Sequence, residues 1–218
     1  MGEIALEEKK MFSVIVPAHN AESTIRKCLD SIKNQTFKNY ELIVVCDACT
    51  DKTVEIAKKY TYHVAEVNFH SDGPTRSVGL DIAKGKWVLF MDADDWYLHE
   101  FCFEILAKKL NEVDAKTDVL VYSIIWKHIG YTKSRSVKGT LYPHCTNKCW
   151  RRSFIGGTRF PDKYVANDAS FHEAMMKKEP RLYEWDMPIY YYNYLNGKSK
   201  SDEIGRTAEN TKQYWSTH

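Results

Sequence analysis

The sequence contains no apolar run long enough to cross a bilayer, and residues 1–10 carry too many charges for a signal peptide. Leu6 stands where a myristoylation signal beginning at Gly2 needs Ser or Thr. The net charge is only +2, which provides no general attraction to nucleic acid or to a membrane surface. We therefore expect no transmembrane segment and a cytoplasmic location.

No glycine-rich phosphate-binding loop follows the first expected strand, which disfavours a nucleotidyltransferase. Disulfides are not expected either, because the six cysteines occur without a secretory signal. The spacings Cys46-x-x-Cys49 and Cys145-x-x-x-Cys149 leave a structural zinc site as an alternative. Cys46 ends an apolar strand, however, and a buried thiol is the more common case at such a position.

The most informative stretch is 87–95, where five apolar residues run into Asp92, Asp94 and Asp95. The apolar run predicts a strand buried on both faces, and ligands bind beyond the carboxyl ends of strands in open α/β sheets. Asp92 and Asp94 are two residues apart, so both carboxylates can face one hard divalent cation. The alternative is an acidic turn in which Asp94 or Asp95 caps the next helix.

Two strand–turn–helix units precede this stretch. Residues 12–16 form a β-rich run that ends at Pro17, and Asn20 is a candidate N-cap with Glu22 in the first helical turn. Apolar residues at helical spacing follow, and a second strand is expected at 39–45. Gly85 is the expected C′ residue of a later helix at 75–83. Two such units in succession predict a parallel sheet.

The second half is less regular. It predicts strands at 118–126 and 189–195 and helices at 146–154 and 169–178. With 218 residues the chain supports one domain with a sizeable core. We divide it into an N-terminal extension (1–10), a domain (11–200) and a C-terminal tail (201–218). Within the domain, 11–97 is the expected donor-binding half and 98–200 the acceptor-binding half.

Six motifs in the same order resemble the family 2 glycosyltransferases of the GT-A fold, from about residue 12 to about residue 199. The family patterns and their matches are P-x-Y-N-x-E at 17–22, D-D-G-S-x-D at 46–51, A-R-N-x-G-L-x-x-A-x-G at 75–85, F-L-D-A-D-D at 90–95, K-L-[FY]-R-R-S-x-[LI] at 148–155, and R-F-P with E-D at 159–168. The sequence departs from these patterns at His19 (Tyr in the family), Cys46 (Asp), Ala48 (Gly) and Asn167 (Glu).

The resemblance implies an α/β GT-A fold: one domain with a mixed, mainly parallel sheet flanked by helices. It implies that Asp47 and Arg76 contact the nucleobase, and that Asp92 and Asp94 face the diphosphate and a Mn²⁺ or Mg²⁺ ion. Asp168 would be the general base. The remaining residues matched to the nucleotide-sugar site are Pro17, Ala18, His19, Asn20, Glu22 and Ala93, and those considered for the acceptor or a phosphate are Asp95, Lys148, Arg151, Arg152 and Asn167.

Without the resemblance, several of these residues have ordinary structural explanations. Asp168 would be a helix N-cap and Arg76 a solvated helix residue. Lys148, Arg151 and Arg152 would form the basic face of a short helix. Some of the tyrosines at 190–194 would lie in the core, and any on an exposed face could stack on a sugar ring.

The function expected from these residues is metal-assisted, inverting transfer of a sugar from a nucleotide-diphosphate donor, a UDP-sugar by preference, to a hydroxyl group of a carbohydrate or glycolipid. One alternative is a modified DNA base as acceptor, because a basic stretch interleaved with aromatic residues could follow a phosphate backbone. This stretch contains Trp126, Lys127, Tyr131, Lys133, Arg135, Lys138 and Tyr142. Another alternative is a non-catalytic protein that binds a nucleotide sugar.

Overall fold

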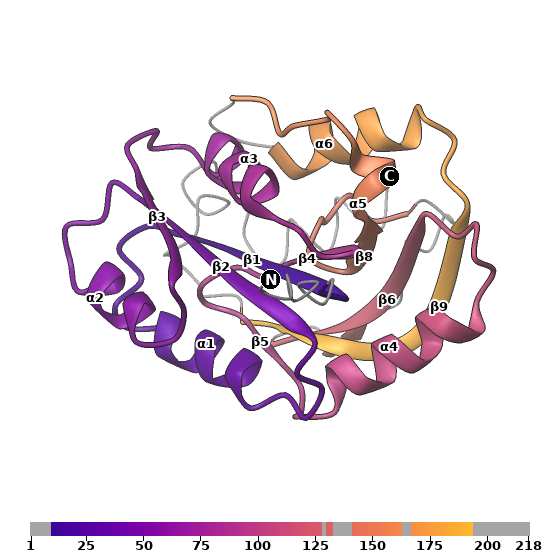
Figure 1. Cartoon of the computed structure of the whole chain (residues 1–218), viewed down its shortest axis with the longest axis horizontal. Coiled ribbons are helices and arrows are strands. Elements are labelled where there is room, and N and C mark those ends of the chain that lie inside the picture. Colours follow the sequence, from indigo (N-terminus) through magenta and orange to yellow (C-terminus); the bar gives the residue numbers. More distant parts are fainter. Residues whose placement is uncertain (1–9, 128–129, 133–140, 163–166, 194–218) are drawn as a thin grey trace, which may run out of the picture.

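The computed structural model describes residues 10–127, 130–132, 141–162 and 167–193. These residues form one mixed sheet in the order β3-β2-β1-β4-β8-β6-β9-β5, with β7 paired to β6 (Figure 1). Helices cover both faces of this sheet. The architecture confirms the expected α/β fold with a single domain, and both expected halves of the domain contribute strands to the same sheet.

The first half contains the predicted parallel units. Strands β1 (Phe12–Ala18), β2 (Tyr40–Asp47), β3 (His63–Val67) and β4 (Trp87–Phe90) are parallel to one another. The helices between them are α1 (Ile25–Lys33), α2 (Thr53–Lys58) and α3 (Asp72–Ile82). The prediction that Pro17 ends β1 is wrong, since β1 continues to Ala18. Strand β4 pairs with β1 only as far as Ile15, so the N–H that proline lacks is not needed on that side.

The second half adds antiparallel strands. It comprises β5 (Trp96–Tyr97), α4 (Cys102–Glu112), β6 (Val119–Trp126), β7 (Gly130–Thr132), β8 (Lys148–Arg151), α5 (Arg152–Ile155), α6 (Asn167–Met176) and β9 (Leu182–Tyr192). Strand β8 is antiparallel to both β4 and β6, whereas β6 and β9 are parallel.

The helix predicted at 146–154 is wrong, because this segment forms β8 and then the single turn α5. Strand β8 is inserted between β4 and β6, where its backbone completes the sheet. Cys149 packs in the core on one face of the sheet and Trp150 in the core on the other. A strand buried on both faces has no polar face, so the local residue pattern did not identify it.

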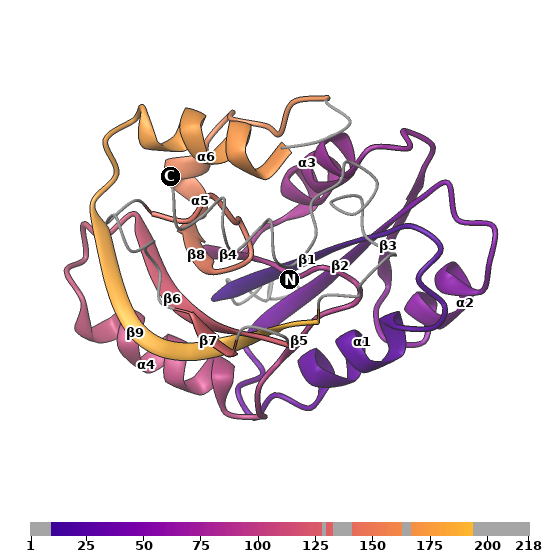
Figure 2. The same cartoon turned by 180° about the vertical axis from the view of Figure 1, so that it is seen from behind.

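Two apolar cores lie on opposite faces of the sheet. Along β1, Val14 packs in one core and Ile15 in the other, as the two-residue period of a strand requires. Helices α1 and α4 contribute Leu29 and Leu106 to the first core, and α3 and α6 contribute Leu80 and Phe171 to the second. Figures 1 and 2 show α1, α2 and α4 on one side of the sheet and α3, α5 and α6 on the other. The carboxyl ends of β1, β2 and β4 meet at one edge between these layers.

Gly85 is required for a different reason from the one its position after α3 suggested. A side chain at this residue would lie 2.6 Å from the backbone nitrogen of Ser13 and 2.6 Å from the carbonyl carbon of Phe12. Its N–H donates to Ser13 Oγ at 2.8 Å and to Glu41 Oε1 at 3.0 Å. The close approach of β1, rather than a left-handed helix end, therefore demands glycine here.

Candidate active site

The turns that follow β1 and β2 are hydrogen-bonded to each other. Asn20 Oδ1 accepts from the N–H of Thr50 at 2.8 Å, and Asp51 Oδ2 accepts from the N–H of Glu22 at 2.9 Å. Glu22 Oε2 in turn accepts from the N–H of Lys52 at 3.2 Å. The N-cap predicted at Asn20 is therefore wrong: helix α1 begins later, at Ile25, and Asn20 fixes the second turn instead.

Pro17 and Ala18 are buried at the end of β1, and they place His19 at the sheet edge. The His19 side chain is exposed, and its Nδ1 lies 2.6 Å from the carbonyl oxygen of Asp47. A carbonyl can only accept, so Nδ1 is the protonated nitrogen in this contact. The His70 ring lies 6.2 Å from the His19 ring, centre to centre. Two imidazoles thus flank the end of β2.

The Asp47 carboxylate organises the loop that follows β3. Its two oxygens accept four hydrogen bonds, from the N–H groups of Phe69 (2.6 Å), His70 (3.0 Å) and Ser71 (2.8 Å) and from the hydroxyl of Thr75 (3.0 Å). Burial alone would raise the pKa of Asp47, but these donors outweigh it and the pKa is lowered. Four bonds use the accepting capacity of a carboxylate, so Asp47 is bound fully by the protein.

Arg76 joins the two carboxylates that the sequence assigned to opposite sides of the reaction. From α3, its Nη2 lies 2.7 Å from Asp92 Oδ1 and its Nη1 lies 3.5 Å from Asp168 Oδ1. The Arg76 side chain is 8% exposed, whereas the side chains of Asp92 and Asp168 are 28% and 26% exposed, so the guanidinium is buried behind two partly exposed carboxylates. Burial alone would raise the pKa of Asp168, but the Arg76 charge and the hydrogen bonds from Cys145 lower it. Arg76 is therefore no solvated helix residue.

Asp168 lies in the first turn of α6 and does not serve as its cap. Its Oδ2 accepts a hydrogen bond at 3.2 Å from the N–H of Cys145, which belongs to the segment before β8. The neighbouring Asn167 is buried and packs on Gly73, where any side chain would lie 3.0 Å from the Asn167 amide. Asn167 thus fixes the contact between α6 and the start of α3, which places Asp168 beside Arg76.

The three carboxylates after β4 differ in their partners. Asp95 is 1% exposed, and its oxygens accept from the Tyr190 hydroxyl at 2.5 Å and from the N–H of Asn193 at 2.7 Å. The Asp94 carboxylate accepts no hydrogen bond from another residue in the part of the chain that the structure describes. Burial, and then the charge of Asp92, raises the pKa of Asp94 to about 6. Among the described residues, none donates a hydrogen bond to the Asp94 carboxylate from elsewhere in the chain, whereas Asp95 anchors β9 to the strand end.

The basic residues of the fifth motif do not gather around these carboxylates. Lys148 is 0% exposed in β8 and donates only to protein oxygens, so it is not on the basic face of a helix. Arg151 pairs with Trp87 at the start of β4, the end of that strand opposite to Asp92. Its guanidinium donates to the carbonyls of residues 115 and 117, and Arg152 donates to the Gly85 carbonyl. The structure gives Arg151 and Arg152 structural partners.

The site contains two residues that the motifs did not indicate. The Tyr190 hydroxyl accepts from the N–H of Asp92 at 3.2 Å while it donates to Asp95, and Cys145 donates to Asp168. Both come from segments whose positions are set by strand pairing rather than by local pattern. The alternating tyrosines of β9 were the only sequence signal for the first, and nothing pointed to the second.

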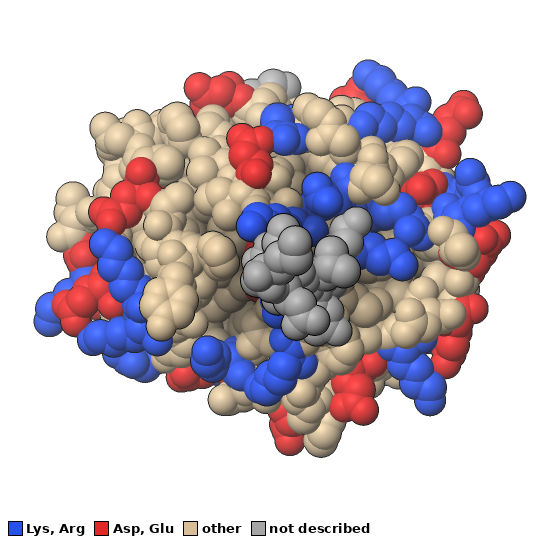
Figure 3. Space-filling model, viewed as in Figure 1, with Lys and Arg blue, Asp and Glu red and all other residues tan. Residues whose placement is uncertain are grey.

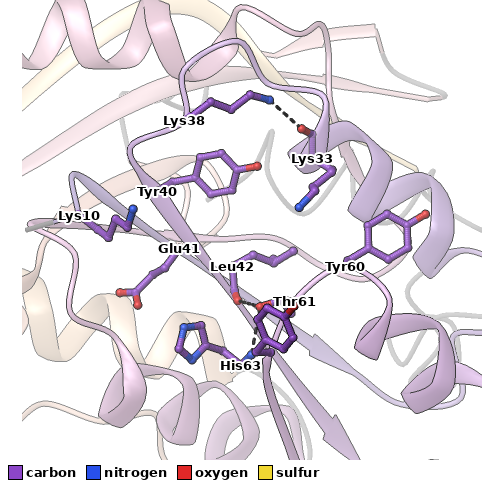
Figure 4. Close-up of a pocket in the computed structure, with 10 residues that line it drawn as sticks. Lys10, Lys33, Lys38, Tyr40, Glu41, Leu42, Tyr60, Thr61 and His63 are labelled. Atoms are coloured by element: carbon purple, nitrogen blue, oxygen red, sulfur yellow. Dashed lines mark hydrogen bonds between the residues drawn. The ribbon is translucent and has the colours of Figure 1, made fainter. Parts of the chain in front are cut away.

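A cavity of about 440 Å³ lies elsewhere, at the opposite edge of the sheet (Figure 4). It is lined by residues that precede or begin β1, β2 and β3, among them Lys10, Tyr40 and His63. The Asp92 and Asp168 carboxylates lie beyond the other ends of the strands. We therefore do not assign this cavity to the carboxylate cluster.

The donor set suits a hard divalent cation. Among the described residues no three His, Cys, Asp or Glu side chains form a ready-made metal cage. The Asp94 oxygens accept no hydrogen bond from another described residue, and Asp92 has one oxygen bound to Arg76, so these two carboxylates are the candidate ligands. Mg²⁺ in particular is commonly held by one or two carboxylates together with substrate phosphates. The residues present therefore fit a metal that is completed by a diphosphate.

Asp92 at the end of β4 and Asp168 in α6 therefore both approach Arg76. The sheet and these carboxylates agree with the GT-A fold that the resemblance implies. The family model described as "Glycosyl transferase family 2" matches residues 13–181. The chain belongs to this family. Within the described residues, no helix has the length and apolar character that a bilayer crossing requires.

Curated relatives match part of the chain. It is 40% identical over 108 residues to glycosyltransferase GlyA of Streptococcus pneumoniae, covering 47% of this chain and 15% of GlyA. It is 33% identical over 112 residues to the putative glycosyltransferase EpsH of Bacillus subtilis, covering 49% of this chain and 33% of EpsH. The matched stretches thus span no more than about a third of these relatives.

Solved structures confirm the fold. The S. aureus TarS 1–349 complex with UDP-GlcNAc superposes with a TM-score of 0.74 at 27% identity, over 86% of this chain and 60% of TarS 1–349. The mannosyltransferase PcManGT of Pyrobaculum calidifontis, in complex with GDP-Man and Mn²⁺, gives a TM-score of 0.72 at 18% identity, over 91% of this chain and 61% of that one. The second similarity concerns the fold alone.

Proposed function

We propose that this domain transfers a sugar from a nucleotide-diphosphate donor, a UDP-sugar by preference, to a hydroxyl group of a carbohydrate or glycolipid, with inversion at the anomeric carbon. The observation that carries the proposal is the convergence of Asp92 and Asp168, from distant parts of the chain, on Arg76, with Asp94 two residues after Asp92. The cytoplasmic location expected from the sequence stays a prediction.

The metal would be held by Asp94, with Asp92 as its second carboxylate. Asp94 is supported as the main ligand because its oxygens accept no hydrogen bond from another described residue, whereas Asp92 already binds Arg76. When bound, Mn²⁺ or Mg²⁺ would offset the charge of the diphosphate as it leaves. Tyr190 keeps the Asp92 backbone in place, which fixes the direction of both carboxylates.

Asp168 would accept the proton of the acceptor hydroxyl during the attack. A base must be ionised for this step, and the Arg76 charge favours the ionised form of Asp168. Asp168 reaches the cluster from α6, whereas Asp92 and Asp94 follow β4, so the acceptor and the leaving diphosphate can occupy opposite sides of the sugar. A single displacement with that geometry inverts the anomeric centre.

The preference for UDP rests on the turns at the sheet edge and on a relative. S. aureus TarS, 27% identical over the superposed part, has been solved with UDP-GlcNAc. We propose that the edge formed by His19 and the loop 69–71 receives the nucleobase. Asp47 supports this edge through the backbone N–H groups it binds. Direct contacts from Asp47 and Arg76 to the base, which the resemblance implies, stay predictions.

Asp168→Asn tests the central step. Asn keeps the shape of the side chain and an oxygen for the Cys145 N–H, but it cannot accept a proton. Transfer should fall roughly a hundredfold or more, the usual effect of losing a positioned base. The measurements are initial transfer rate, donor affinity and melting temperature on the same purified variant. Donor affinity should stay near native, whereas the melting temperature should fall, because Asn cannot pair with the charge of the buried Arg76.

A non-catalytic protein would show no transfer in the native form, and near-native transfer by Asp168→Asn would move the base to another residue.

The DNA alternative has less support. Lys133, Arg135 and Lys138 of its basic stretch lie outside the described residues. On the face seen in Figure 3, lysines and arginines are interspersed with acidic residues rather than arranged in a continuous stripe. Acceptor binding that weakens steeply with salt would revive this alternative.

A further inference from the structure

A fully buried lysine binds the segment that contacts the candidate base, and the mechanism above does not explain it. The Lys148 side chain, in β8, donates at 2.6 Å to the carbonyl oxygens of Tyr142 and His144 and at 2.7 Å to Asn147 Oδ1. The ammonium group has three N–H donors, and each has an acceptor here. These acceptors all belong to the segment 142–147, which leads into β8.

Core side chains from the sheet hold the rest of this segment. The Tyr122 hydroxyl, from β6, donates to the Thr146 carbonyl at 2.6 Å, and the Trp150 indole N–H donates to the Cys145 carbonyl at 3.3 Å. The Tyr122 N–H donates to the Asn147 carbonyl at 3.0 Å. The carbonyls of five residues (Tyr142, His144, Cys145, Thr146 and Asn147) therefore all bind donors from β6 or β8.

The segment fixed in this way binds the candidate base. The Cys145 N–H donates to Asp168 Oδ2 at 3.2 Å, while Arg76 approaches Asp168 Oδ1 at 3.5 Å. One carboxylate is thus held from two directions, by a cation on α3 and by a backbone N–H before β8. The position of that N–H depends on the bonds made by Lys148 and Tyr122, because they set the path of the backbone on both sides of Cys145.

A lysine in the core is a poor source of stability. Burying an ammonium group is costly, and well-packed apolar residues often replace buried charges without loss. Burial lowers the pKa of Lys148 to about 7, which reflects that cost. Lys148 thus costs stability while it binds three acceptors of one segment. Its presence is better explained if it fixes the position of that segment.

We propose that the segment 142–147, clamped by Lys148 and Tyr122, is the positioning element of the general base, with Lys148 acting on the reaction only through the Cys145–Asp168 hydrogen bond. This inference rests on the proposed function, in which Asp168 takes the acceptor proton. The clamp keeps one Asp168 oxygen on the Cys145 N–H, which fixes the rotation of the carboxylate. A displacement of reacting groups by about 1 Å can cost roughly a hundredfold in rate, so the orientation matters.

The test is a double-mutant cycle on transfer. Lys148→Met keeps most of the volume and removes the three donors, and it should lower kcat roughly ten- to a hundredfold. The affinity for UDP should change less than twofold, because the segment lies on the base side. In the Asp168→Asn background, Lys148→Met should lower kcat no further, since the group it positions has been removed.

Gln35→Met is the matched control. Gln35 is also fully buried, and it makes three hydrogen bonds with backbone groups, to the carbonyls of Ser31 and His99 and from the N–H of Phe103. None of these bonds reaches the carboxylate cluster. Gln35→Met should lower the melting temperature as a buried polar deletion does, but leave kcat within twofold. An equal fall in kcat for both variants would reduce the effect of Lys148 to general destabilisation and overturn the proposal.

Two further outcomes separate the possible failures. If Lys148→Met lowers kcat by the same factor in the native and Asp168→Asn backgrounds, Lys148 does not act through the base and this inference is overturned. If Asp168→Asn alone transfers at a native rate, the proposed function fails instead. Should Lys148→Met not fold, Tyr122→Phe removes one bond of the clamp and goes through the same cycle, and a native kcat in that variant contradicts the proposal.

Discussion

Asp47 and Asp94 both stand at the carboxyl ends of parallel strands of one sheet, yet the protein treats them in opposite ways. Asp47 accepts four hydrogen bonds from the loop after β3 and from α3, and its pKa is lowered. Asp94 accepts none from another described residue, and burial beside Asp92 raises its pKa to about 6. The first carboxylate holds the site together, and the second is left available for a ligand.

This difference separates a supporting residue from a binding residue more clearly than sequence position does. Both residues belong to motifs that the resemblance links to the donor. Only their hydrogen-bond partners show that the oxygens of Asp47 are fully used within the protein, whereas those of Asp94 accept no hydrogen bond from another described residue. Substitutions at the two carboxylates and in the turn after Asp47 test this difference.

Asp47→Ala should cost roughly 2 to 4 kcal/mol in the free energy of unfolding at pH 7, because it leaves the backbone N–H groups of Phe69, His70 and Ser71 without their acceptor. Urea unfolding followed by fluorescence measures this. The native pKa lies below the unfolded value of 3.8, so the contribution is present above pH 3.8 and is lost as the pH falls through the native pKa. A variant as stable as the native protein at pH 7 would contradict the supporting role.

Asp94→Asn should raise the free energy of unfolding when EDTA is present, whereas Asp47→Ala lowers it. The native pKa of about 6 exceeds the unfolded 3.8, so the native state retains a proton that the unfolded state has lost, and stability falls as the pH rises between these values. Asn removes this cost, and above pH 6 the variant should be more stable by roughly 1 kcal/mol, after allowance for partial exposure. Melting temperatures from pH 4 to pH 8 check it. A pH-independent difference would show that Asp94 is not perturbed.

Ala48→Gly tests the backbone of the turn that directly follows Asp47. Ala48 has φ 48°, a left-handed conformation that costs an L-residue about 1 kcal/mol. Glycine relieves this strain but gains entropy in the unfolded chain, so the net stabilisation should be about 0.5 kcal/mol. Ala65→Gly, in β3, is the control and should destabilise the protein. Destabilisation by Ala48→Gly of the same size would mean that the turn stores no strain.

The first half of the fold was predictable because its elements show clear local patterns. The continuous run of buried residues in β1 and the spacing of Ile25, Cys28, Leu29 and Ile32 in α1 follow directly from these patterns. Strand β8 was not predictable, because it depends on pairing with β4 and β6 and because it contains the buried, charged Lys148. The family match was then the only route to placing Asp168 near Asp92.

The partners of the site residues were harder to predict than their identities. Asp47, Asp94 and Asp168 were all named from motifs, but nothing local indicates that loop 69–71 would bind Asp47 through backbone N–H groups. Backbone donors leave no mark in the sequence, because every residue except proline has one. Arg76 was matched to the nucleobase through the resemblance. Its ion pairs with Asp92 and Asp168 were not predictable, because they depend on how α3 and α6 meet.

The most direct test of the account is the stabilisation of the protein by UDP with Mn²⁺ and with EDTA. If Asp94 is the carboxylate left free for a metal that a diphosphate completes, UDP should raise the melting temperature clearly more in Mn²⁺ than in EDTA. Asp94→Ala should abolish that difference, while Gln35→Met, which is destabilised elsewhere, should retain it. Equal stabilisation by UDP with and without metal in the native protein would contradict the role given to Asp94.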